Sequence, residues 1–250
     1  MSIYDLTIGL PAPKPLRVGG TALFLDLDGT LAPIAARPQD VRPDPRRTSL
    51  LERLAQALSG RLAVVSGRTL TDVDRILEGC VTPVAAIHGL VRRGPDGRVF
   101  EARPHPQLAK AVAGFRAFAA RDSGLIVEEK GDLSTALHFR LASRHAEAAR
   151  ACARTLAAQT GLSLQEGDMV EELRTPGASK GDSVRAFMAA APFAGARPVF
   201  VGDDATDEDG FEAAQALGGV GVVVGAARAT GARYRLAGVE AALAWLEAAL

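Results

Sequence analysis

The chain has 250 residues, of which 48% are hydrophobic and 5% are aromatic. This length and composition exclude a fibrous or disordered protein and predict a globular α/β protein of one large or two small domains. Lys plus Arg number 29 and Asp plus Glu also number 29, so no net charge draws the chain to nucleic acid or to an anionic membrane, and we expect neither as a partner.

The N-terminus has no basic segment followed by an apolar run, and no later stretch has the length of a membrane span. Cys80 and Cys152 are too few and too far apart for a disulfide framework or a zinc cluster. We therefore expect a cytoplasmic protein that binds a small molecule and is a monomer. Residues 1–20 are rich in Pro and Gly and are interpreted as an irregular leader without chemistry.

Apolar runs alternate with helical patterns from residue 21 onward. The pattern predicts strands at 22–27, 61–66 and 84–88, with helices at 45–58 and 69–77. Strands that alternate with helices require crossover connections, which produce a parallel sheet. We therefore predict a doubly wound α/β fold.

The pattern changes near residue 90. A hairpin is predicted around 95–97, and an α+β segment with paired antiparallel strands follows it. Its helices are expected at 106–121 and 144–159, and its strands at 124–130, 134–140 and around 162–173. The α/β rhythm returns with a helix from 177, a strand at 197–203, a helix at 207–217, a strand at 219–224 and a last helix ending near 250. We expect a catalytic core made of 1–102 and 174–250, interrupted by an inserted α+β domain at 103–173.

Two acids follow the first predicted strand in "TALFLDLDGTLAP". Side chains two residues apart in a strand share a face, so Asp26 and Asp28 point the same way if the strand extends that far. The carboxyl end of a parallel strand faces the crevice where such folds bind ligands, and two close carboxylates favour a bound cation. Asp, Gly and Thr are also common turn residues, so this motif alone leaves a turn and a site equally open.

A second acidic group follows the strand at 197–203, in "VFVGDDATDEDGF". Asp207 and the two acids after it suit the start of a helix, but a helix start does not explain Asp203 and Asp204. Two acidic strand ends of one parallel sheet can converge on one hard cation, for which Mg²⁺ is the expected ion.

Two further segments offer groups that suit a phosphate. "VVSGRT" ends a strand with Ser66, a flexible glycine and Arg68, and Thr69 then has the spacing of a helix cap. "GASKGDSV" places Lys180 in the first turn of a helix, where its ammonium can bridge a carboxylate and a phosphate. Taken alone, Ser66 is typical of a helix cap or turn, and Lys180 is typical of a solvent-exposed side chain. Together with the acidic strand ends, the two residues predict one phosphate site.

The ordered motifs "DLDGT", "SGR", "SKGD" and "GDDATDE" resemble the haloacid dehalogenase (HAD) superfamily of phosphatases, which carries them on a Rossmann-like core. The resemblance extends over residues 21–245. Finer features, "LFLDLDGTLAPI", "IHG", "EEKGDLSTALHFR" and "EELRTPGASKGDSV", resemble the trehalose-6-phosphate phosphatase family. That resemblance implies a cap domain between the second and third motifs and a sugar phosphate as substrate.

The resemblance also implies residue roles. Asp26 is expected to attack phosphorus and form an aspartyl phosphate, and Asp28 to protonate the leaving sugar oxygen and later activate water. Ser66 and Lys180 are expected to hold phosphoryl oxygens. The expected Mg²⁺ ligands are Asp26, the backbone carbonyl of Asp28 and Asp203, with Asp204 or Asp207 in an outer shell.

The inserted domain is expected to select the sugar, because the core motifs address phosphate and metal. The residues that the resemblance implies as sugar contacts are Arg68, His88, Gly89, Glu128, Lys130, His138, Arg140 and Glu172. Three of these, Glu128, His138 and Arg140, also suit the solvent-facing positions of an antiparallel sheet. The alternatives in function are a phosphatase for sucrose 6-phosphate or mannosyl-phosphoglycerate, and a phosphosugar-binding module without catalysis.

Overall fold

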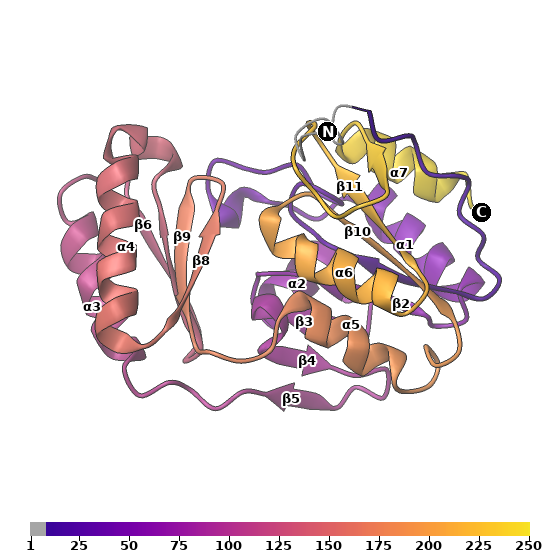
Figure 1. The fold of residues 1–250 in the computed structure, drawn as a ribbon, viewed down its shortest axis with the longest axis horizontal. Helices are drawn as coiled ribbons and strands as arrows, with labels where there is room; N and C mark the ends of the chain where they lie inside the picture. Colours follow the sequence, from indigo (N-terminus) through magenta and orange to yellow (C-terminus); the bar gives the residue numbers. More distant parts are fainter. Residues whose placement is uncertain (1–8) are drawn as a thin grey trace, which may run out of the picture. The chain divides into compact units, whose positions relative to one another are not determined.

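A computed structural model describes residues 9–250, which divide into two compact units. The described part of the first unit comprises 9–100 and 178–250, and the second unit comprises Glu101–Gly177 (Figure 1). Along the chain, the second unit therefore interrupts the first. Within residues 9–250, no helix has the length and apolar character needed to cross a membrane.

An eight-stranded sheet forms the centre of the first unit, in the order β12-β11-β10-β1-β2-β3-β4-β5. All neighbouring strands from β12 to β3 run parallel, and β4 pairs antiparallel with β3. The strands are β1 (Thr21–Leu25), β2 (Leu62–Val65), β3 (Val84–Ala86), β4 (Val91–Arg93), β5 (Val99–Glu101), β10 (Arg197–Gly202), β11 (Val220–Val224) and β12 (Tyr234–Leu236). This is the doubly wound α/β class, with a mostly parallel sheet, that the sequence predicts.

The helices of this unit are α1 (Pro45–Ala57), α2 (Leu70–Leu77), α5 (Lys180–Met188), α6 (Glu208–Ala216) and α7 (Val239–Glu247), with short 3-10 turns η2 (Pro38–Asp40), η3 (Ile87–Gly89) and η5 (Ala205–Asp207). Helices α5 and α6 lie side by side over one face of the sheet (Figure 1). Phe24 of β1 points to that face, where its ring stacks on Phe193 with centroids 5.5 Å apart. Because side chains alternate along a strand, Leu23 and Leu25 point to the opposite face.

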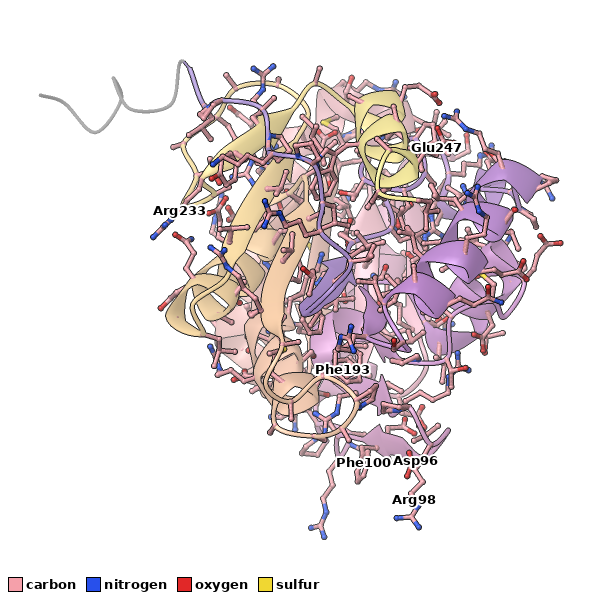
Figure 2. The ribbon with its side chains drawn as sticks, turned by 90° about the vertical axis from the view of Figure 1, so that its right-hand side faces the viewer. Asp96, Arg98, Phe100, Phe193, Arg233 and Glu247 are labelled. Carbon is pink, nitrogen blue, oxygen red and sulfur yellow. The ribbon has the colours of Figure 1, made fainter. Side chains whose placement is uncertain are left out.

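The hairpin formed by β4 and β5 lies at the edge of this sheet, where the sequence predicts a turn around 95–97. Phe100 of β5 is exposed, whereas Phe193 is fully buried (Figure 2). The hairpin therefore extends the sheet without adding to its apolar core.

The second unit has a four-stranded antiparallel sheet in the order β6-β7-β9-β8. Its elements are α3 (Leu108–Ala119), β6 (Ile126–Lys130), β7 (Ser134–His138), η4 (Arg140–His145), α4 (Ala146–Thr160), β8 (Ser163–Gly167) and β9 (Val170–Arg174). Phe115 of α3 and Leu156 of α4 share one apolar core with Leu137 and Leu173 of the sheet, so both helices pack on the same face. The opposite face carries the alternate side chains of each strand, which are mostly polar.

Most predicted helices and strands are confirmed to within a few residues, but the edge strand β12 was missed. This strand has only three residues, and its pairing with β11 places Arg235 and Leu236 opposite Val223 and Val224. A pattern that short has no measurable period, so only the paired sheet reveals it.

The predicted leader at 1–20 falls partly on residues 1–8, which lie outside the described residues. The stretch 9–20 has no helix or strand, and its backbone accepts hydrogen bonds from Arg235 and Trp245.

Candidate active site

The carboxyl ends of β1 and β10 bring two acidic segments to the same edge of the sheet. Leu25 of β1 pairs with Val201 of β10, and the N–H of Asp26 donates to the carbonyl of Val201 at 2.9 Å. Asp203 follows β10 directly. Parallel pairing in this register therefore places Asp26 and Asp203 beside each other, as the two apolar runs followed by acids predict.

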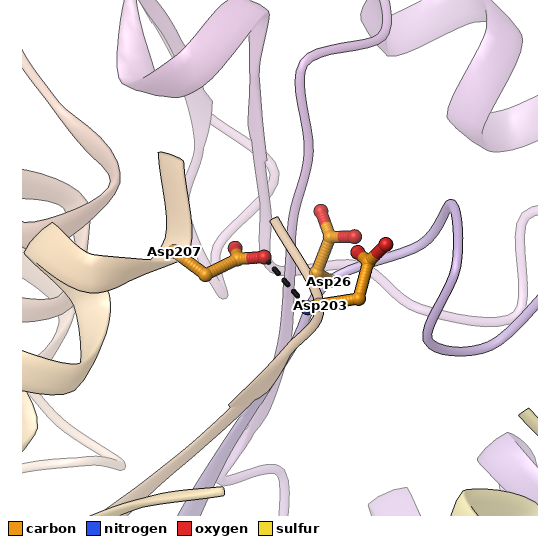
Figure 3. Close-up of side chains that lie close together, drawn as sticks. All are labelled: Asp26, Asp203 and Asp207. Atoms are coloured by element: carbon orange, nitrogen blue, oxygen red, sulfur yellow. Dashed lines mark hydrogen bonds between the residues drawn. The ribbon is translucent and has the colours of Figure 1, made fainter. Parts of the chain in front are cut away.

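Three carboxylates, Asp26, Asp203 and Asp207, form one cluster, with one oxygen of each within 4.8 Å of the others (Figure 3). Lys180, the first residue of α5, adds a positive charge to the cluster. Its Nζ lies 2.8 Å from Oδ1 of Asp26 and 2.7 Å from Oδ1 of Asp207. Lys180, Asp26 and Asp207 are each at least 96% buried, so these charges interact with little screening by solvent.

Asp207 organises this cluster through both of its oxygens. Its Oδ1 accepts from Lys180 and its Oδ2 accepts from the backbone N–H of Asp204 at 3.0 Å. The same Oδ2 accepts from the backbone N–H of Asp203 at 2.9 Å (Figure 3). Asp204 has a different position: its carboxylate caps the turn η5 by accepting from the N–H of Ala205. Of the two residues that the sequence left as alternatives, Asp207 therefore lies in the buried cluster and Asp204 lies at its rim.

Burial and mutual repulsion shift the pKa values of these groups. Burial, assisted by repulsion from Asp207 and Asp203, raises the pKa of Asp26 well above its usual range despite the ion pair with Lys180. Burial and the charge of Asp207 raise the pKa of Asp203 to about 7. For Lys180, burial acts to lower the pKa, but the ion pairs with Asp207 and Asp26 outweigh it and raise the pKa. With its three carboxylates ionised, the cluster has more negative than positive charge, and a bound cation would relieve the repulsion that raises these pKa values.

The donor set fits a hard divalent cation. Among residues 9–250, no hydrogen-bond partner reaches the buried Oδ1 of Asp203, which is costly unless another group binds it. The structure explains why the first motif has glycine at position 29. The φ of Gly29 is +78°, which suits glycine, and an added Cβ would overlap the carboxylate of Asp203. Carboxylate oxygens that converge in this way are the ligands that Mg²⁺ prefers.

Arg228, which the sequence did not indicate, stabilises the second acidic segment. Arg228 lies after β11, and its guanidinium donates to the carbonyls of Asp203 at 3.1 Å and Asp204 at 2.8 Å. It also pairs with Glu208 at the start of α6. The segment around Arg228 has no motif, so no pattern in the sequence indicates that this side chain returns to the strand end.

The end of β2 lies next to the end of β1, because Leu25 pairs with Val64. Ser66 is buried, and its Oγ accepts a hydrogen bond from the N–H of Arg68 at 3.2 Å. Thr69 caps α2 by accepting from the N–H of Asp72, as its spacing predicts. The structure therefore places Ser66 on the carboxyl edge of the sheet, one strand away from Asp26.

His88 and Gly89 follow β3 in the turn η3, on the same edge of the sheet. The N–H of His88 donates to the carbonyl of Ser66 at 3.0 Å, and a Cβ at Gly67 would lie 2.6 Å from the His88 ring. A Cβ at Gly89 would lie 2.6 Å from the carbonyl of Ser179, the cap residue of α5. Gly67 therefore permits close approach of the His88 ring, and Gly89 permits close approach of the backbone at the start of α5.

Asp28 lies beyond the strand whose alternation would have given it the same orientation as Asp26. Strand β1 ends at Leu25, and residue 28 lies in a turn closed by a bridge to Ala32. Its two carboxylate oxygens accept from Arg68 at 2.7 and 2.8 Å. The strand does not extend to residue 28 because the chain turns at Gly29, so strand alternation does not govern where Asp28 points.

The polar face of the second unit gathers most of the predicted sugar contacts of that unit. Glu172 of β9 accepts from Ser134 of β7 and from Nζ of Lys130 of β6, at 2.5 Å for the lysine. These three residues are at least 94% buried. Ser134 is a member that the sequence reasoning missed; its register opposite Lys130 would have placed it on this face.

Glu128 and His138 form a second pair on that face, with Oε2 and Nε2 2.8 Å apart. Burial acts to raise the pKa of Glu128, but the hydrogen bond to His138 and the charge of Lys130 outweigh it and lower the pKa. Arg140 does not join this group, because it lies in η4 beyond the strand and pairs with Asp168 at 2.9 Å. Of the candidates in the second unit, Glu128, Lys130, His138 and Glu172 therefore share one face of the sheet.

Comparison with known proteins gives a family match over most of the chain. A family model described as Trehalose-phosphatase matches residues 24–240. The chain is 38% identical over 228 residues to the trehalose-6-phosphate phosphatase of Escherichia coli (strain K12), with 90% of this chain and 85% of the relative covered. The matched range contains every residue of the acidic cluster.

Solved structures share the fold. The C-terminal domain of a C. albicans trehalose-6-phosphate phosphatase superposes with a TM-score of 0.84 at 19% identity, covering 95% of this chain and 97% of that chain. A phosphatase of the HAD enzyme superfamily from Bacteroides thetaiotaomicron superposes with a TM-score of 0.60 at 17% identity, covering 95% and 96%. At these identities the likeness concerns the fold.

Proposed function

The chain belongs to the trehalose-phosphatase family, and we propose that it hydrolyses trehalose 6-phosphate to trehalose and phosphate. The observation that carries this proposal is the buried cluster of Asp26, Asp203 and Asp207 bridged by Lys180. A nucleophilic carboxylate, a cation site and a fixed ammonium are what phosphoryl transfer requires at one point.

In the first step that we propose, an oxygen of Asp26 attacks phosphorus while the bond from phosphorus to the sugar oxygen breaks. Asp28 donates a proton to that oxygen, and trehalose leaves with its 6-hydroxyl restored. The product is an aspartyl phosphate at residue 26. In the second step Asp28 takes a proton from water, whose oxygen attacks phosphorus and releases phosphate, which restores the Asp26 carboxylate.

The carboxylates of Asp26 and Asp203 and the backbone carbonyl of Asp28 would hold Mg²⁺, which neutralises charge on the phosphoryl oxygens when it is bound. Lys180 and Ser66 would hold the phosphoryl oxygens that are not transferred. Asp207 supports this arrangement indirectly, since it orients Lys180 and the backbone of Asp203. Asp204 would act only through the turn that it caps.

We propose the first unit as the catalytic core and the second unit as the cap that supplies sugar contacts. The supporting observation is the polar face of the second unit, where buried charged groups are held in fixed pairs. A site built from such groups discriminates strongly, because a substrate that lacks a matching hydroxyl leaves them unpaired. Glu128, Lys130 and Glu172 are the proposed sugar contacts of this unit, with His88 and Gly89 in the core.

The substrate is tested by phosphate release with Mg²⁺ from trehalose 6-phosphate, sucrose 6-phosphate, mannosyl-phosphoglycerate and glucose 6-phosphate. We expect kcat/KM for trehalose 6-phosphate to exceed the others by roughly 10²-fold or more, since unmatched polar groups are costly. The Glu172→Gln variant should reduce this preference while leaving hydrolysis of p-nitrophenyl phosphate nearly unchanged. A higher kcat/KM for another sugar phosphate would assign that sugar, and binding without phosphate release from any of them would indicate a binding module.

A glycine substitution tests the acidic cluster. Gly29 and Gly97 have nearly the same φ, +78° and +79°, but only at Gly29 would an added methyl overlap a side chain, that of Asp203. Both Gly→Ala variants should lose about 1–2 kcal/mol of unfolding free energy from the left-handed backbone. Only Gly29→Ala should also lose phosphatase activity, by roughly 10- to 100-fold, because a displaced ligand misplaces the reacting groups.

Chemical denaturation and steady-state kinetics of the two variants provide this comparison. Equal activity of Gly29→Ala and Gly97→Ala would contradict a role for the contact between residue 29 and Asp203.

A further inference from the structure

The carboxylate of Asp28 is held by the side chain of Arg68. Nε of Arg68 donates to Oδ2 at 2.7 Å and Nη2 donates to Oδ1 at 2.8 Å. This two-point geometry sets the plane of the carboxylate as well as its distance, which one hydrogen bond cannot do. In residues 9–250, every recorded hydrogen bond to the Asp28 side chain comes from this guanidinium.

Arg68 is itself held from three directions. Its Nη1 donates to the carbonyl of Pro38 at 2.9 Å, its N–H donates to Oγ of Ser66, and its carbonyl accepts from the N–H of Ile87 at 2.8 Å. Its side chain is 9% exposed, whereas that of Asp28 is 34% exposed. Arg68 is therefore held in place by groups other than Asp28, whereas the orientation of the Asp28 carboxylate depends on Arg68.

Asp28 needs a partner because the sheet does not orient it. It lies three residues beyond the end of β1, in a turn that the hydrogen bond from Gly29 to Ala32 closes at 2.7 Å. Asp26, by contrast, is joined to β10 through its backbone and to Lys180 through its side chain. Proton transfer requires the carboxylate within hydrogen-bond reach of the leaving oxygen, so loss of orientation slows the reaction directly.

The ion pair with Arg68 leaves part of the Asp28 carboxylate available for proton exchange. A carboxylate has about four lone-pair positions, and a bidentate arginine uses two of them. The remaining two can face a substrate oxygen or a water. The guanidinium in turn uses three of its five N–H donors in the bonds described to Asp28 and Pro38.

We propose that Arg68 is a positioning residue for Asp28, fixing the plane of the carboxylate that exchanges a proton with the leaving group, and is not primarily a sugar contact. This inference rests on the proposed phosphatase function. It differs from the role that the family resemblance implies, in which Arg68 is a sugar contact. The bond to Asp28, which lies 40 residues earlier in the chain, has no signature in the motif "SGR".

The Arg68→Lys variant tests the proposal, because lysine keeps the charge but cannot bond both carboxylate oxygens in a fork. We expect kcat for trehalose 6-phosphate to fall roughly 10- to 100-fold, with KM within about 3-fold of the wild type. The p-nitrophenyl phosphate reaction needs no proton on its leaving group, so its kcat/KM should fall by less than about 3-fold. That second substrate also shows that the variant is folded.

A double-mutant cycle separates positioning from contact with the sugar. In an Asp28→Ala background, Arg68→Lys should change the residual kcat/KM by less than about 3-fold, because the group that it positions is gone. Affinity is measured separately with Asp26→Asn enzyme, by calorimetry with trehalose 6-phosphate. Adding Arg68→Lys to that enzyme should leave the dissociation constant within about 3-fold.

The matched control is Arg75→Lys. Arg75 also pairs with an aspartate, Asp72, and donates to a backbone carbonyl, that of Val41, but it touches none of the proposed catalytic groups. This variant should show wild-type kinetics. A rise in KM or in the dissociation constant of more than about 10-fold with kcat unchanged, or an equal effect of Arg68→Lys with and without Asp28, would overturn the proposal.

These outcomes are distinct from failure of the proposed substrate. If wild-type enzyme prefers another sugar phosphate, the same variants are measured on that substrate, and the cycle still decides the role of Arg68. If wild-type enzyme hydrolyses no phosphate ester, the proposed function fails, and the positioning role fails with it.

Discussion

Replacing Asp26 with Asn should abolish turnover while leaving the fold intact. The amide has nearly the same shape as the carboxylate but cannot form the bond to phosphorus, so we expect kcat to fall by at least about 10⁴-fold. Burial raises the pKa of Asp26, which means that its charged form is unfavourable in the folded protein. Because Lys180 keeps its ion pair with Asp207 in this variant, removing the charge of Asp26 should leave the unfolding free energy of the metal-free protein unchanged or slightly higher.

Phosphate release from trehalose 6-phosphate and denaturant unfolding measure the two parts of this result. The control is Asp74→Asn, which removes one partner of a similarly close ion pair, with Arg93 at 2.7 Å, in helix α2. That variant should retain nearly full activity. More than about 1% of wild-type activity in folded Asp26→Asn enzyme would exclude Asp26 as the nucleophile.

Replacing Lys180 with Met should affect stability as well as catalysis. The side chain is 4% exposed and pairs with both Asp26 and Asp207, so its removal leaves buried carboxylates without their counter-charge. Breaking a buried ion pair from one side costs about 3–5 kcal/mol of unfolding free energy. We also expect kcat to fall by roughly 10²- to 10³-fold, as when one group that stabilises transition-state charge is removed.

Magnesium should partly reverse the loss of stability, since a divalent cation can supply the missing charge. At 100 times the dissociation constant, a ligand adds about 2.7 kcal/mol to the stability of the folded state. Unfolding of wild-type and Lys180→Met proteins with EDTA and with excess MgCl₂ measures this effect. Lys110→Met is the control, because Lys110 is exposed on α3. Loss of stability equal to that control would contradict the buried ion pairs.

The sequence predicts the fold well wherever a strong period continues over many residues. Helix α1 begins at Pro45, as expected, and its predicted last residue differs by one from the observed Ala57. Strand β12 escapes prediction because three residues carry no period, and its identity as a strand depends on pairing with β11. The acidic strand ends are predictable for a related reason, since parallel pairing aligns the carboxyl ends of β1 and β10.

What the sequence does not predict are contacts between side chains far apart in the chain. How Asp204 and Asp207 divide depends on how the turn η5 folds: two backbone N–H groups donate to Asp207, which lies in the buried carboxylate cluster, whereas Asp204 caps the turn. Arg228 and Arg68 have partners that no local pattern specifies. A long, flexible side chain can reach many positions, so its partner becomes known only when the backbone is placed.

The insertion of the second unit into the first affects the order in which the chain folds. Asp26 and its partner Lys180 are separated by 154 residues, and β10, the neighbour of β1, is made later still. During synthesis the second unit, whose strands β6 and β7 are adjacent in sequence, is complete before β1 gains this neighbour. Local hairpins close at a smaller entropic cost than distant pairings, so we expect the assembly of Asp26 with Lys180 to be a late event in folding.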